Sequence, residues 1–88
     1  MSIWMNCKVE ISVYESEHIS LKKVLQDMLK YEEFIFGEFN TNTKNGFCKQ
    51  SVHLSVCADG MQCLELLRRM HQEIHKYRGV IEVEHALV

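Results

Sequence analysis

Apolar and polar residues alternate strictly from Met5 to Tyr14, near the start of the chain. Alternation with a period of two predicts a strand that buries one face and exposes the other. The residues from Val80 to Val88 alternate in the same way and predict a second such strand, with Ile81 and Val83 toward the core. In the first strand the inward set is Met5, Cys7, Val9, Ile11 and Val13, and the outward set is Asn6, Lys8, Glu10, Ser12 and Tyr14.

Two other segments have helical spacing. Ser20 is placed to cap a first helix that runs to about Tyr31, with Leu21, Val24, Leu25 and Met28 on one stripe. A second helix, roughly Gly60 to Tyr77, has apolar residues at i, i+3, i+4 and i+7. Arg78 and Gly79 then predict its C-terminal cap. The apolar face of the second helix consists of Cys63, Leu66, Leu67, Met70, Ile74 and Tyr77.

Two β-rich runs lie between the helical segments, from Glu33 to Thr41 and from Phe47 to Cys57. The Asn45-Gly46 step between them is a strong hairpin signal, because both residues adopt the left-handed conformation of a tight turn easily. In the later run Val52, Leu54 and Val56 point inward, and Ser51, His53 and Ser55 point outward.

The element order is therefore strand, helix, strand, strand, helix, strand. This order predicts the α+β class and a ferredoxin-like βαββαβ sandwich, with both helices on one face of a four-stranded antiparallel sheet. The expected spatial order is 4-1-3-2, which places the closing strand at a sheet edge. A chain of 88 residues is too short for two cores, so we expect residues 1–88 to form a single domain.

Charge and composition exclude several classes of function. The net charge of -2 lacks the positive field of nucleic-acid binders. An RNA-binding sheet also needs stacked aromatic residues, and among the outward strand residues only Tyr14 is aromatic. No apolar run is long enough for a signal peptide or a membrane span, so we expect a cytoplasmic protein with neither a nucleic-acid nor a membrane partner.

Catalytic signatures are missing from the sequence. Glu32-Glu33 and Glu15/Glu17 do not have the spacing of opposed catalytic carboxylates. The four cysteines lie within or beside apolar patterns without a CxxC pair, which favours buried reduced thiols over disulfides or nucleophiles. We therefore expect no enzymatic activity, no metal and no cofactor. The cysteines are Cys7, Cys48, Cys57 and Cys63.

Several exposed positions are candidates for a contact surface. His71 and His75 are spaced i, i+4 and, with Arg68, form a flank of the second helix. A solvated helix border explains them, and a metal or small-ligand sensor is the alternative. Trp4 is either a lid on the core or a partner contact. The candidate partner-facing sheet or edge comprises Lys8, Glu10, Tyr14, Glu82 and Glu84.

The stretches KVEISVY, SEHISLKKVLQDML, FCKQSVHLSV and GVIEVEHAL together resemble an ACT domain, a small βαββαβ regulatory module of amino-acid metabolism enzymes and (p)ppGpp synthetases. The resemblance covers most of the chain and implies a regulatory module. It also implies a ligand or partner loop at the end of the first strand, with Ile19 at the position where the family carries glycine. That loop would use Ser16, Glu17, His18 and Ser20.

Three functions are consistent with these features. We expect a non-enzymatic regulatory or protein-interaction module of ACT-like type that forms homodimers through its sheet edges. The alternative is a small standalone inhibitor that blocks a larger protein, as immunity proteins, antitoxins and phage-encoded anti-defence proteins do. The third is a metal or small-ligand sensor.

Overall fold

The chain forms four strands, two α-helices and one short 3-10 helix. In chain order these are β1 (Ser2–Tyr14), η1 (Glu15–Glu17), α1 (Leu21–Met28), β2 (Glu33–Lys44), β3 (Phe47–Asp59), α2 (Gly60–His75) and β4 (Val80–Leu87). The computed structural model describes the backbone of residues 2–87 and the side chains of residues 2–84.

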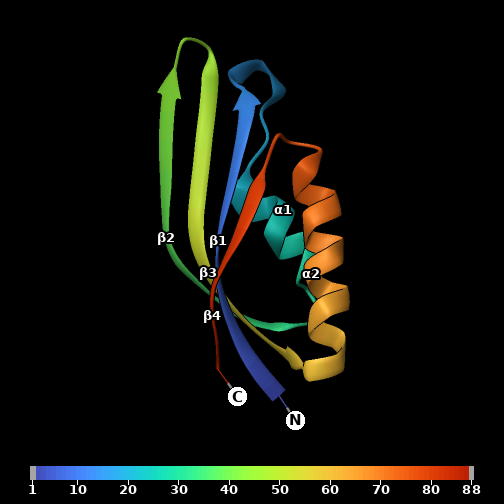
Figure 1. The fold of residues 1–88 in the computed structure, drawn as a ribbon. Helices are drawn as coiled ribbons and strands as arrows, with labels where there is room; N and C mark the ends of the chain where they lie inside the picture. Colours follow the sequence, from blue (N-terminus) through green and yellow to red (C-terminus); the bar gives the residue numbers. More distant parts are fainter. Residues whose placement is uncertain (1, 88) are drawn as a thin grey trace.

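All strand pairs are antiparallel, and both helices lie against one face of the sheet (Figure 1). The sheet order is β2-β3-β1-β4, which read from β4 is the predicted 4-1-3-2. The α+β class and the four-stranded antiparallel sheet with two helices are confirmed, and the arrangement is consistent with a ferredoxin-like fold in general. β4 lies at the predicted edge.

The predicted alternation and the helical stripes form the core. Every second residue of β1 from Met5 to Val13 is buried, and so are Leu66, Met70 and Ile74 of α2. From α1 the core receives Leu21, Leu25 and, just past the helix, Leu29. The predicted inward and outward sets of β3 are confirmed: Val52, Leu54 and Val56 are buried and Ser51, His53 and Ser55 are not.

The strands are longer than the sequence indicates. β1 begins at Ser2 rather than Met5, because the added residues continue to pair with β3 as far as Ser2 opposite Asp59. β2 and β3 likewise extend to Lys44 and Asp59, since both continue to pair beyond their apolar runs. The prediction for Val83 is wrong: it lies on the edge strand beside a register shift, where its side chain is 45% exposed.

Both helices end earlier than predicted. α1 ends at Met28 instead of about Tyr31, because the chain turns at once toward β2, with Glu32 N donating to Leu29 O at 2.8 Å. α2 ends at His75 instead of Tyr77. The left-handed residue after α2 is Arg78, at φ 55°, and not Gly79 as the predicted cap requires. Gly79 instead packs closely, with its N–H donating to Ile74 O at 3.0 Å.

All four cysteines are free, but only Cys7 is fully buried, and Cys48, Cys57 and Cys63 are half-buried. The Cys7 side chain points into the core from β1. Burial raises the pKa of the Cys7 thiol from 9.0 to about 11, and the Glu84 carboxylate adds a smaller contribution in the same direction. A protonated, inaccessible thiol of this kind is a packing residue.

The Cys7 thiol predicts a loss of stability at alkaline pH. Because the folded protein holds this proton more tightly than the unfolded chain, its contribution is complete below about pH 9 and disappears as pH rises toward 11. A shift of this size corresponds to about 2–3 kcal/mol. Urea unfolding between pH 8 and pH 11 measures it, with Cys7→Ala as the control. Lysine and tyrosine residues titrate in both proteins. If the free energy of unfolding fell equally steeply with pH in both, the loss of stability would not come from the Cys7 thiol.

Candidate functional site

The face of the sheet opposite the helices, called here the open face, carries the outward residues of the strands. On β1, Lys8 is paired in register with Glu82 of β4, and Glu10 with Val80. These four residues line a hollow of about 150 Å³. The carboxylate of Glu10 also lies 3.4 Å from Lys49 Nζ on β3. The structure therefore brings together three predicted partner-facing residues, Lys8, Glu10 and Glu82, beside the β4 edge.

Two β-bulges lie near His53 on the open face. On β2, Gly37 and Glu38 together oppose His53, because Phe36 is paired with Leu54 and Phe39 with Val52. An alanine Cβ at Gly37 would lie 3.1 Å from the His53 carbonyl oxygen, so glycine leaves room there.

On β4, the register shifts between Asn6, opposite His85, and Cys7, opposite Val83, which leaves Glu84 as an extra residue. Bulges frequently redirect a side chain beside a functional site.

The redirected Glu84 carboxylate contacts His53 across β1. Glu84 Oε1 lies 2.8 Å from His53 Nδ1, and both side chains are about half exposed. Next to this pair the Ser55 hydroxyl donates to Asn6 Oδ1 at 2.6 Å. All four strands contribute to a hollow of about 420 Å³, whose wall includes Ile35 and Gly37 of β2.

This polar cluster can present hydrogen-bonding groups to a partner. Glu84 orients the His53 ring, as a carboxylate does in a catalytic dyad. The neighbouring Ser55 hydroxyl, however, gives its proton to Asn6 and not to the imidazole, so the pair does not activate it. Sequence reasoning placed His53 on the outward face but did not select it, because its contact with Glu84 depends on the β4 bulge.

β4 forms one edge of the sheet, because its only neighbour within residues 2–87 is β1. Along this edge Val80 and Val83 expose 62% and 45% of their surfaces. Glu82 and Glu84 alternate with these apolar residues, and both are exposed. The β4 edge thus combines unpaired backbone with apolar and acidic side chains.

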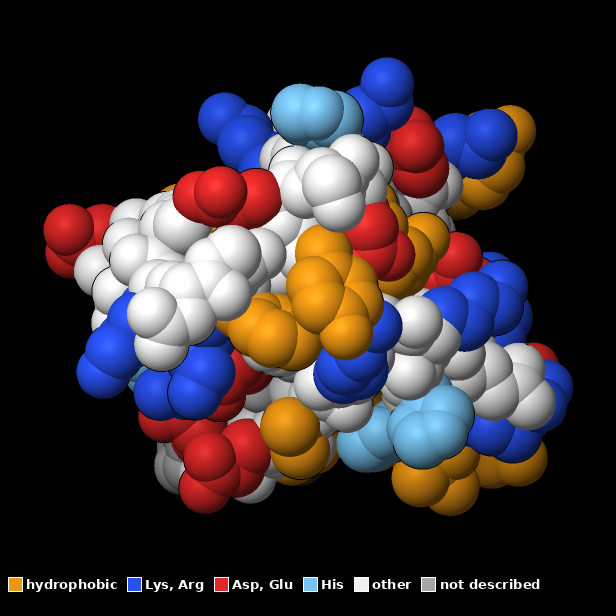
Figure 2. Space-filling model, turned by 90° about the horizontal axis from the view of Figure 1, so that it is seen from above, with side chains coloured by type: hydrophobic (Ala, Val, Ile, Leu, Met, Phe, Trp, Pro, Cys, Tyr) orange, Lys and Arg blue, Asp and Glu red, His pale blue; other side chains and the backbone are white. Residues whose placement is uncertain are grey.

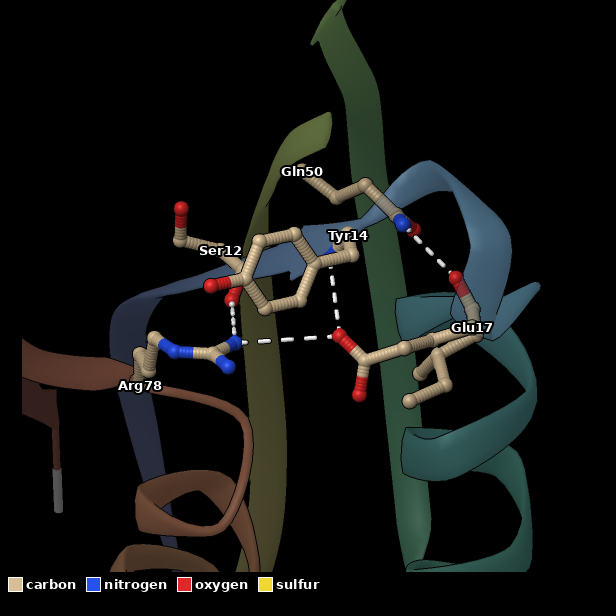
Figure 3. A network of polar contacts seen from close by, with 6 residues as sticks. Ser12, Tyr14, Glu17, Gln50 and Arg78 are labelled. Carbon is tan, nitrogen blue, oxygen red and sulfur yellow. Dashed lines mark hydrogen bonds and ion pairs between the residues drawn. The ribbon is translucent and has the colours of Figure 1, made fainter. Parts of the chain in front are cut away.

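The loop that the family resemblance selects is held in place by its own residues (Figure 3). The Glu17 carboxylate accepts from Tyr14 N at 2.8 Å and lies 3.8 Å from Arg78 Nη1. Arg78 in turn donates to the Ser12 carbonyl at 3.0 Å and lies over the Tyr14 ring. The role of Glu17 in the structure is thus to join the end of β1 to the end of α2.

The same loop is closed on its other side by Gln50 of β3. Its side-chain nitrogen donates to Ile19 O at 2.7 Å (Figure 3), and its side-chain oxygen accepts from Leu21 N at 2.8 Å. Ser20 caps α1 as predicted, accepting from Lys23 N at 3.4 Å. Ser16 and His18 are exposed, and His18 has a left-handed φ of 53°. All four predicted loop residues are exposed, and Glu17 and Ser20 are the two whose side chains make the contacts above.

Tyr14 lies at the far end of β1 from Glu82 and Glu84, and not with the other partner-facing candidates. Its ring contacts Phe47, with centroids 4.5 Å apart, and both rings are 40–45% exposed. Figure 2 looks onto this end of the molecule and shows hydrophobic side chains near the centre with charged ones around them. The aromatic pair covers the hairpin end of β1 and β3.

The predicted flank of α2 is a solvent-exposed surface. Arg68 donates two hydrogen bonds to Glu65, which lower the pKa of that carboxyl group. His71 and His75 are exposed, and together with Gln72 and Gly79 they line an open groove. Within the described part of the chain no cluster of three His, Cys, Asp or Glu side chains is placed to hold a metal ion.

Trp4 is half-buried on the open face and does not lie over the core. The flanking residue Met5 points into the core, so Trp4 points the other way. Of its two predicted roles, the core lid is wrong, and the partner contact stays a prediction.

Among the described residues, no helix has the length and apolarity needed to cross a membrane. No protein-family model matches the chain, and no curated protein matches it either.

Similar solved structures include the de novo designed protein Foldit4, with a TM-score of 0.59 and 16% identity over 100% of this chain and 98% of that one. A tripeptidase from Staphylococcus aureus has a TM-score of 0.47 and 10% identity over 97% of this chain and 28% of that one. Aminopeptidase PepT from Bacillus cereus has a TM-score of 0.46 and 10% identity over 99% of this chain and 29% of that one. At these identities the likeness to the designed protein shows the fold alone.

Proposed function

We propose that this chain is a non-enzymatic protein-interaction module of the ferredoxin-like type, and that it binds its partner through the β4 edge. The observation that carries the proposal is the unpaired outer side of β4, with exposed Val80 and Val83. Unpaired N–H and C=O groups along an edge form a template for an incoming strand. Apolar side chains beside them lose contact with water when a strand is added, which favours association.

The ferredoxin-like part of the proposal is supported by the element order together with the sheet order β2-β3-β1-β4. The regulatory, ACT-like part stays a prediction. In the loop which that resemblance selects, the carbonyl of Ile19 accepts from Gln50, and Glu17 contacts Arg78. A small ligand at this loop would have to bind the exposed Ser16 and His18 or displace the contacts of Ile19 and Glu17. A partner strand at β4 would not have to displace these contacts.

A standalone inhibitor that occupies a larger protein is the second candidate, and it would use the same edge. Glu82 and Glu84 favour it over a homodimer, because an acidic edge is better matched to a different protein than to its own copy. Self-association through β4 is the first property to measure, because a β4-mediated homodimer would favour the regulatory module over the inhibitor.

Strand addition at β4 predicts selective protection of its amides. A peptide of about ten residues with alternating threonine and valine is expected to slow hydrogen exchange in β4 and to leave β2 unchanged. Val83→Lys is expected to weaken this binding at least several-fold, because a lysine on an edge disfavours strand pairing. The matched control is Leu64→Lys, at an exposed apolar position of α2. A chain that stays monomeric at millimolar concentration and binds no strand peptide would contradict the proposal.

A further inference from the structure

We infer that the β4 edge selects a basic strand of a different protein, with lysine or arginine at alternate positions, in preference to the β4 strand of a second copy. This inference rests on the proposed function and specifies its partner. Three features of the described residues carry it: the positions of the two glutamates, the side chains that neighbour each of them on β1 and β3, and the composition of both sheet edges.

Glu82 and Glu84 both belong to the open face. Glu82 lines a hollow there with Lys8 and Val80, and Glu84 reaches His53. Each carboxylate therefore has a cationic or protonatable neighbour on its inner side, toward β1 and β3. Among residues 2–87 no strand lies on the outer side of β4, and both glutamates are exposed. A strand added at this edge would place its own side chains beside the two carboxylates.

A second copy pairing symmetrically through β4 would bring like charges together. In a two-fold antiparallel pair, residues on the same face are matched about the centre of the overlap. A centre at Glu82 or at Glu84 puts that residue opposite itself, and a centre at Val83 puts Glu82 opposite Glu84. Directly opposed side chains have Cβ atoms about 5 Å apart, where like charges are destabilising. Overlaps centred nearer Val80 pair only the first few residues, since the chain leaves the sheet at Gly79.

The other edge of a second copy does not provide the missing cations. β2 carries the exposed glutamates Glu33 and Glu38, and its lysine, Lys44, is at the hairpin end. Alternate basic residues therefore occur on neither edge of this chain, so the complementary strand has to come from another protein.

The complementary strand has a definite pattern. Basic residues two apart would lie beside Glu82 and Glu84, and the residue between them would face the opposite side, next to Val83. Arginine suits the two basic positions best, because its guanidinium group bonds a carboxylate with two parallel N–H groups. The apolar intervening residue covers the 45% of Val83 that is exposed.

Three peptides with valine at every second position test this inference. Their intervening residues are arginine, threonine or glutamate, and binding to the full chain is measured by fluorescence anisotropy at low and high salt. The arginine peptide is expected to bind roughly tenfold more tightly than the threonine peptide, and the glutamate peptide more weakly still. Salt should remove most of the difference, because exposed charge pairs are screened.

Variants separate this inference from the proposed function. The double variant Glu82→Gln/Glu84→Gln is expected to bind the three peptides equally, whereas the control Glu65→Gln on α2 should keep the preference for arginine. Equal binding of all three peptides by the wild-type chain would overturn the charge selection and leave the strand-binding function intact. If no peptide binds, both the proposed strand-binding function and the inference about charge are wrong. A β4-mediated homodimer that Val83→Lys dissociates would overturn the preference for a different protein.

Discussion

Replacing Gly79 by alanine is expected to lower the free energy of unfolding by about 3 kcal/mol. The added Cβ would overlap Cγ2 of Ile74 and lie 2.6 Å from Ile74 O and 2.8 Å from Glu10 O. Ile74 is buried in the core, and the two oxygens belong to the backbone of α2 and β1, so none of the three can move aside easily. Equilibrium unfolding in urea, followed by circular dichroism, measures the loss.

Gly46→Ala provides the matched control. Gly46 has a φ of +80° in the hairpin turn, and a Cβ added there would meet no atom within 4 Å. Alanine at this position is strained by its backbone alone, which costs about 1 kcal/mol. If Gly79→Ala lowers the free energy of unfolding no more than Gly46→Ala does, Gly79 is not closely packed between α2 and β1.

The contrast between these glycines reflects what sequence can predict. The residue types of Asn45 and Gly46 predict the hairpin turn, because a tight hairpin requires positive φ values there, and φ is 55° at Asn45 and 80° at Gly46. The same reasoning predicts Gly79 as a helix cap, yet the residue with a left-handed φ is Arg78. Glycine is needed at position 79 because Ile74 and Glu10 lie too close for a side chain. A contact with a distant segment such as β1 leaves no local pattern in the sequence.

The sheet and the core were predictable because alternation and helical spacing are local properties of the chain. The polar contacts were not. Gln50 closes the loop before α1 by bonding Ile19 and Leu21, some thirty residues away in the sequence. One signal existed: Gln50 is a polar residue at an inward position of β3, between Cys48 and Val52. A polar side chain that faces the core requires a hydrogen-bond partner, but the sequence does not identify that partner.

The candidate site was predictable only in part. Lys8, Glu10 and Glu82 share the open face because strand alternation puts them there. The contact of Glu84 with His53 depends on one extra residue in β4. An added residue in one strand changes the face of everything after it, and uniform alternation in the sequence does not show where it falls. Val83 precedes the added residue and is in register with the inward residue Cys7, but at the sheet edge it stays 45% exposed, which alternation does not show either.

Leu25→Ala is expected to be comparably destabilising, by about 3 kcal/mol. α1 has eight residues, and a helix of that length is not stable on its own in water. It depends on Leu21, Leu25 and Leu29, all fully buried against the sheet, and Leu25 is central among them. Truncating Leu25 removes its contacts and leaves a cavity.

Urea unfolding measures the loss, and hydrogen exchange should show that the α1 amides lose more protection than those of β1. The control is Gln26→Ala on the exposed side of the same helix, which is expected to change stability by less than about 0.5 kcal/mol. Alanine at that position keeps the helix propensity high and removes no buried atoms. If both substitutions had the same small effect, packing against the sheet would not be what holds α1 in place. Because the loop of Ser16 to Ser20 leads directly into α1, its position would then depend on the contacts of Gln50 and Glu17 alone.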